Sequence, residues 1–287
     1  MTKLRTLTAL IMAPLAIAAV LLLPTGWMVA LGAVLFLAAL WEWLRLADLE
    51  DILARWVLLV ANLGLMVALA WGSRTSAGFN WALLELMVVA GVAWWLLGLL
   101  WLARPRLGSD PATHARVFKL AAGTLAVVPA WCALAVIHGA DLEPSLLPGV
   151  PQGHVWLLLA LMTVWAADTG AYFAGRRFGR RKLAPSISPN KTVEGMLGGL
   201  AAGVLVALVV APLAGIGPER LPLVALVALV AAGFSVVGDL VESLLKRQVG
   251  VKDSGDWLPG HGGVLDRLDG VLAALPAFAL AKAVTGL

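Results

Sequence analysis

The chain has 287 residues, of which 61% are hydrophobic and 13% are charged, and its formal net charge is +4. Soluble domains carry about 25% charged residues, so this composition excludes an ordinary soluble protein and indicates an integral membrane protein. The small positive charge does not argue for a nucleic-acid partner, because basic residues in a membrane protein usually mark its cytoplasmic loops.

The apolar runs are continuous and about 20 residues long, which favours spanning helices over alternating barrel strands. We therefore expect an all-α, polytopic membrane protein with about nine transmembrane helices. The expected spans are approximately 6–23, 26–46, 53–72, 80–102, 118–138, 154–175, 192–213, 221–243 and 264–285. The first run continues directly into further apolar sequence, so we expect a retained span and not a cleaved signal peptide.

Basic residues are unevenly distributed among the predicted loops. Lys and Arg are concentrated in loops 103–119, 176–191 and 244–263, whereas loop 139–153 has none. The positive-inside rule then places the three basic loops and the N-terminus in the cytoplasm, and the C-terminus on the other side.

Residues 1–152 contain no dense cluster of chemical groups, and we interpret them as scaffold helices. Glu42 and Glu85 lie near predicted helix ends, where charges are better tolerated than at the bilayer centre, so both are interpreted as structural acids. The histidines of this region lack partners at metal-ligand spacing. We interpret residues 153–287 as the catalytic region of the same membrane unit.

A polar segment joins the sixth and seventh spans. Asp168 lies inside the sixth span, and Arg176 opens a basic loop. Ser188–Pro189 predicts a turn, after which the seventh helix should begin near Lys191. The first-turn N–H groups of that helix, together with Lys191 and the Thr192 hydroxyl, form an anion site of the helix-terminus kind. The alternative is a capped basic loop without a ligand.

Gly195, Gly199 and Gly203 recur every four residues on the seventh span. Such a stripe of small residues lets another helix approach closely. We favour a partner helix in the same chain, and the alternative is a second copy of the chain in a homodimer.

The densest polar segment runs from Ser243 to Asp269 and mixes both signs of charge with several glycines. Asp266 and Asp269 are three residues apart, as are Asp239 and Glu242 just upstream, so each pair shares a helical face. Carboxylates without a nearby cysteine suit Mg²⁺ better than zinc. The segment therefore indicates a metal–phosphate site, with a salt-bridged surface loop as the alternative.

This segment resembles the signature of the phosphatidate cytidylyltransferases, also called CDP-diacylglycerol synthases. The matching positions are Ser243, Lys246, Arg247, Lys252, Asp253, Gly255, Leu258, Pro259, His261, Gly262, Gly263, Asp266, Arg267 and Asp269. A second pattern of that family is matched by Ser188, Pro189, Lys191, Thr192, Glu194 and Gly195. The resemblance is detailed in the C-terminal half and only general in the N-terminal half.

The resemblance implies that CTP and phosphatidate react to give CDP-diacylglycerol and pyrophosphate, with Mg²⁺ as cofactor, in the inner membrane of a bacterium. The implied catalytic residues are Asp239, Lys246, Arg247, Lys252, Asp253, His261, Asp266, Arg267 and Asp269. The implied substrate-binding residues are Asp168, Arg176, Ser188, Pro189, Lys191, Thr192 and Glu194. The expected Mg²⁺ ligands are Asp239, Asp266 and Asp269.

Two alternatives stay open at this point. One is a CTP-dependent kinase of a lipid alcohol, and the other is a transporter that uses carboxylates within the membrane. A transporter would be expected to show paired interrupted helices in two repeat halves, and no such repeat is evident.

The two polar segments are separated by two spans, so both return to the cytoplasmic face. We expect one composite site there, with Lys191 near the nucleotide and with its metal held by Asp239 and Asp266.

Overall fold

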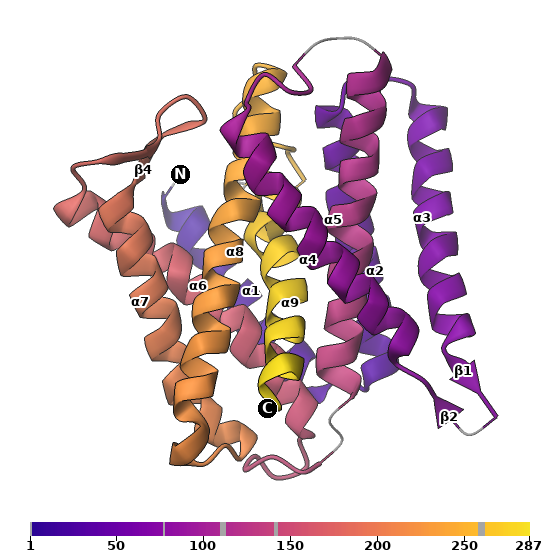
Figure 1. The fold of residues 1–287 in the computed structure, drawn as a ribbon, viewed down its shortest axis with the longest axis vertical. Helices are drawn as coiled ribbons and strands as arrows, with labels where there is room; N and C mark the ends of the chain where they lie inside the picture. The colour runs from indigo at the N-terminus through magenta and orange to yellow at the C-terminus, as the bar shows by residue number, and fades with distance from the viewer. Residues whose placement is uncertain (1, 77, 110–112, 141–142, 258–261) are drawn as a thin grey trace.

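The computed structural model describes residues 2–76, 78–109, 113–140, 143–257 and 262–287 (Figure 1). Nine long helices make up most of the described chain, and eight of them are long and apolar enough to span a membrane. They are α1 (Thr2–Leu22), α2 (Thr25–Leu46), α3 (Ile52–Gly72), α4 (Ala82–Ala103), α5 (Thr113–Gly139), α6 (Gln152–Phe178), α7 (Val193–Val210), α8 (Leu221–Gln248) and α9 (Leu265–Thr285). The predicted all-α, multi-pass membrane architecture is confirmed.

Two helices extend further than their apolar runs indicate. α6 continues to Phe178 and α8 continues to Gln248, so their last turns contain basic residues. Positive side chains near a helix C-terminus interact favourably with the helix dipole. Run length alone misses such polar last turns, and in α8 this turn holds Lys246 and Arg247 of the signature segment.

Short strands and 3₁₀ turns complete the described chain. Strands β1 (Arg74–Thr75) and β2 (Gly78–Phe79) pair antiparallel, as do β3 (Lys182–Ala184) and β4 (Ser188–Thr192), and η1 (Ala211–Ala214) and η2 (Pro218–Arg220) precede α8. The prediction of a turn at Ser188–Pro189 is wrong, because both residues belong to β4 and the turn lies just before them. A two-stranded ribbon has only edge strands, where proline is tolerated.

Helix α7 begins at Val193, slightly later than predicted. The Thr192 hydroxyl oxygen accepts a hydrogen bond from the Gly195 N–H at 3.1 Å and so caps the helix. The glycine stripe of α7 packs against α6: a methyl group at Gly199 would lie 2.6 Å from the Ala167 carbonyl oxygen. The stripe therefore has its partner within the chain, as we favoured.

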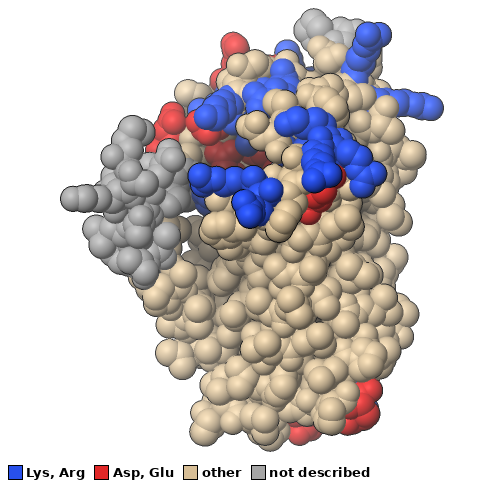
Figure 2. All heavy atoms as spheres, turned by 90° about the vertical axis from the view of Figure 1, so that its left-hand side faces the viewer, with Lys and Arg blue, Asp and Glu red and all other residues tan. Residues whose placement is uncertain are grey.

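The two halves of the chain share one helical bundle. α9 lies between α8 and the pair α4 and α5, while α6 and α7 flank α8 on the other side (Figure 1). The β3–β4 ribbon, the end of α8 and the start of α9 lie at the same end of the bundle, opposite the C-terminus. Lys and Arg gather at that end on the face shown in Figure 2.

Candidate active site

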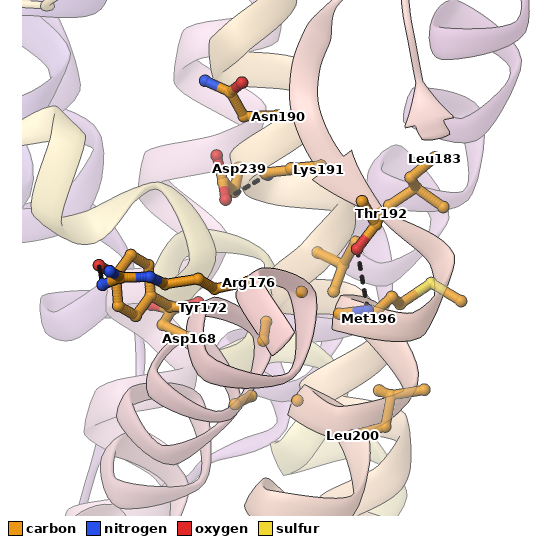
Figure 3. A pocket seen from close by; sticks show the side chains of 16 residues that line it. Asp168, Tyr172, Arg176, Leu183, Asn190, Lys191, Thr192, Met196, Leu200 and Asp239 are labelled. Carbon is orange, nitrogen blue, oxygen red and sulfur yellow. Dashed lines mark hydrogen bonds and ion pairs between the residues drawn. The ribbon is translucent and has the colours of Figure 1, made fainter. Parts of the chain in front are cut away.

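The two polar segments of the C-terminal half meet in the structure. Lys191, at the end of β4, directs its ammonium group at the Asp239 carboxylate of α8 and forms an ion pair with it (Figure 3). Lys191 is 48 positions before Asp239 in the sequence. The two segments therefore meet as expected, although one of the carboxylates grouped there is not among those predicted.

A pocket of about 490 Å³ lies between α6, α7, α8 and β4. Its charged lining residues are Asp168, Arg176, Lys191 and Asp239. Its apolar lining includes Leu200, two turns into α7, and parts of α6 and α8. The pocket thus brings charged side chains and apolar side chains together in one lining (Figure 3).

Three carboxylates from two helices lie close together beside this pocket. Asp239 and Glu242 of α8 and Asp269 of α9 have ligand oxygens within 4.8 Å of one another. The close approach of the helices depends on Gly238, because a methyl group there would overlap the Asp269 carbonyl oxygen. We call Asp239, Glu242 and Asp269 the acidic group.

Glu242 is the most deeply buried member of the acidic group, with 1% of its surface exposed. Lys246 Nζ forms an ion pair with its Oε2 at 2.5 Å, but neither carboxylate oxygen has a hydrogen bond of good geometry among the described residues. A buried carboxylate oxygen without a donor is costly unless a cation approaches it. Its position therefore suits an oxygen ligand of a cation.

Asp266 was predicted to be a metal ligand, and the structure places it outside the acidic group. Its carboxylate accepts hydrogen bonds from Lys246 Nζ at 2.7 Å, from the Ser254 N–H at 3.0 Å and from the Gly263 N–H at 2.8 Å. These three donors occupy Asp266 in holding the signature loop against α8. Glu242 takes the place in the acidic group that the sequence analysis gave to Asp266.

The other predicted catalytic residues are more dispersed. Arg247 Nε donates to the Ile187 carbonyl oxygen at 3.2 Å and so ties α8 to the β3–β4 ribbon. Lys252 and Asp253 are exposed and line a second hollow together with Arg45 of α2. Arg267 is exposed in the first turn of α9. His261 lies outside the described residues.

The predicted substrate-binding residues divide into two sets. Asp168, Arg176, Lys191 and Thr192 line the pocket. Ser188 and Pro189 belong to β4, and Glu194 accepts hydrogen bonds from the Arg180 and Arg181 N–H groups at 2.9 and 3.1 Å. The members of this second set shape the ribbon beside the pocket.

Comparison with known proteins identifies the family of this chain. Residues 3–284 match the model of the cytidylyltransferase family. The chain belongs to that family. It is 39% identical over 280 residues to the phosphatidate cytidylyltransferase of Pseudomonas aeruginosa, an alignment that covers 97% of this chain and 96% of the relative. It is 35% identical over 289 residues to the phosphatidate cytidylyltransferase of Haemophilus influenzae, with 97% of each chain covered.

A cytidylyltransferase handles a triphosphate, whose negative charge calls for cations. The acidic group fits a hard divalent cation, because it offers carboxylate oxygens only and includes the unpartnered Glu242 Oε1. Glu242 was missed as a ligand candidate although it is three residues after Asp239 on the same helical face. That spacing was the signal in the sequence that could have identified Glu242. The residue itself lies just before the signature, which begins at Ser243.

Proposed function

We propose that this member of the cytidylyltransferase family is a phosphatidate cytidylyltransferase, which transfers the cytidylyl group of CTP to phosphatidate. The observation that carries the proposal is the pocket between α6, α7 and α8, whose lining combines cations and carboxylates suited to phosphates with apolar side chains. A soluble nucleotide and a lipid with an anionic headgroup need those two surroundings side by side. The names of the two full-length relatives support the same substrates.

The reaction is an in-line substitution at phosphorus. A phosphate oxygen of phosphatidate forms a bond to the α-phosphorus of CTP, and the bond from that phosphorus to the α–β bridging oxygen breaks. Pyrophosphate leaves with the electron pair of the broken bond. Because the attacking phosphate is already anionic at neutral pH, the site needs no strong general base, and catalysis depends on positioning and charge stabilisation.

The residues divide this work between them. We propose that Asp239, Glu242 and Asp269 hold Mg²⁺, which when bound neutralises charge on the phosphates. Lys191 donates hydrogen bonds to a nucleotide phosphate. When the nucleotide binds, this contact replaces the ion pair between Lys191 and Asp239. Arg176, on the opposite wall of the pocket, suits the phosphatidate headgroup. The acyl chains stay in the bilayer, because removing them from it costs about 0.8 kcal/mol per CH₂ group.

The transfer of a nucleotidyl group is favoured over the kinase alternative by the family and by the names of the relatives. An assay of the purified protein with CTP and phosphatidate separates the two reactions by their products. We expect CDP-diacylglycerol and pyrophosphate, and we expect a chelator to abolish their formation until Mg²⁺ is restored. Phosphorylated lipid together with CDP, or turnover that withstands the chelator, would contradict the proposal.

Lys191→Ala provides an internal comparison in the same assay. We expect it to raise the CTP concentration needed for half-maximal rate far more than the phosphatidate concentration, because Lys191 faces the acidic group. Equal shifts for both substrates would assign Lys191 to general packing of the pocket.

We propose that the basic end of the bundle faces the cytoplasm and that the N-terminus lies on that side of the bacterial inner membrane. The charge asymmetry of the loops supports this orientation. Cysteines introduced at Arg180 and at Glu143 should then react with a membrane-impermeant thiol reagent from the cytoplasmic and the external side, respectively. The native Cys132 is buried and gives little background. Labelling of both positions from one side would refute the orientation.

A further inference from the structure

A glutamate of the N-terminal half reaches the signature loop. Glu42 of α2 was interpreted as an interfacial acid, yet only 2% of its surface is exposed. Its carboxylate accepts hydrogen bonds from the Ser254 hydroxyl at 2.8 Å, from the Val264 N–H at 3.1 Å and from the Leu265 N–H at 2.8 Å. Three donors from a segment more than 200 positions away thus converge on one buried side chain.

Two of these donors belong to the start of α9. The first N–H groups of a helix have no acceptor within the helix, and a negative charge there interacts favourably with the helix dipole. The residue at the cap position of α9, Val264, supplies no side-chain acceptor. Glu42 therefore caps α9 from another helix and fixes where α9 begins.

The capping of α9 by Glu42 affects the position of the acidic group in two ways. Along α9, Asp269 lies one helical turn beyond the capped Leu265, so its position follows from that of the helix start. Through the loop, the Ser254 N–H binds Asp266, and Asp266 in turn holds Lys246 at 2.7 Å. Lys246 is the ion-pair partner of Glu242.

The glycines around Glu42 give independent support. A methyl group at Gly255 would overlap Glu42 Oε1, and one at Gly263 would overlap Glu42 Oε2 and the Ser254 hydroxyl. Neither glycine has a positive φ, so the backbone conformation does not require glycine at these positions. The Glu42 carboxylate alone excludes a side chain at Gly255, and at Gly263 it does so together with the Ser254 hydroxyl and the Gly255 N–H.

We propose that Glu42 is a positioning residue for nucleotidyl transfer, which docks the start of α9 and the signature loop so that Asp269 and Glu242 meet Asp239. The proposal rests on the proposed function and extends it to a side chain that lies outside both family patterns. It also gives the N-terminal half a defined part in the site beyond that of a scaffold.

The test compares Glu42→Ala and Glu42→Gln with Glu85→Ala, whose side chain is exposed on α4. Each full-length variant is purified, its folded fraction is measured by thermal unfolding, and Mn²⁺ affinity and Mg²⁺-dependent kcat are expressed per folded molecule. Loss of groups that orient metal ligands typically costs roughly 10- to 100-fold in metal affinity or activity. We expect a loss of that size for Glu42→Ala, a smaller loss for Glu42→Gln, which keeps one acceptor oxygen, and none for Glu85→Ala.

A double-mutant comparison tests the contact itself. Gly255→Ala should impair Mn²⁺ binding in the wild-type background and add almost nothing in the Glu42→Ala background, because the overlap has been removed. Wild-type Mn²⁺ affinity and kcat in the folded fraction of Glu42→Ala would overturn the proposal, as would additive effects of the two substitutions. Because Mn²⁺ binding does not depend on the reaction, a wild-type protein that binds Mn²⁺ without making CDP-diacylglycerol would instead count against the proposed function.

Discussion

Replacing Asp269 by asparagine is expected to lower turnover by at least about 100-fold, the loss typical of removing one key electrostatic group from a site. The amide keeps the volume of the side chain and can still accept the hydrogen bond from the Gly270 N–H, which the carboxylate accepts at 2.7 Å. It removes one negative charge from the acidic group, so the Mg²⁺ concentration needed for half-maximal rate should rise as well. Rates of CDP-diacylglycerol formation over a Mg²⁺ titration measure both effects.

Glu219→Gln is the matched control, because Glu219 is an exposed carboxylate in η2, ahead of α8 and far along that helix from Asp239. It makes the same change from acid to amide outside the acidic group and should keep wild-type turnover. Near-normal turnover of a well-folded Asp269→Asn variant would remove Asp269 from the proposed set of ligands.

The sequence predicts the helices of this protein well because each depends on a local property, the length of an apolar run. It also predicts that the segments around Lys191 and Asp239 meet, since two spans return the chain to the same face. The short β3–β4 ribbon was missed because strands of three and five residues in a basic loop leave no periodic pattern to detect.

The assignment of individual carboxylates needed the structure. Asp266 and Asp269 share a helical face, and spacing cannot tell which of them joins Asp239 and Glu242. The difference arises from the loop, whose Ser254 and Gly263 N–H groups bind Asp266. The contacts of Glu42 could not be predicted from the sequence. Its hydrogen bond to Ser254 joins residues 212 positions apart, and no local sequence pattern indicates such a contact.

The approach of α8 to α9 at Gly238 leads to the other large expected effect. A methyl group at this position would overlap the Asp269 carbonyl oxygen and lie 3.0 Å from the Ala273 side chain. Overpacking of this kind costs about 1–3 kcal/mol and is relieved by moving the helices apart. Asp239 follows Gly238 directly, so a shift between the helices separates Asp239 from Asp269.

Gly238→Ala is therefore expected to lower turnover by about 100-fold, since a misplacement of about 1 Å at reacting groups can have that effect. Gly233→Ala is its control on the same helix, because a methyl group there meets no atom within 4 Å. The control should keep wild-type turnover and gain up to about 1 kcal/mol in stability, because alanine is the better helix former. The comparison is made by measuring the Mn²⁺ affinity and the turnover of both purified variants. Equal behaviour of the two variants would show that the acidic group does not depend on the close contact between α8 and α9.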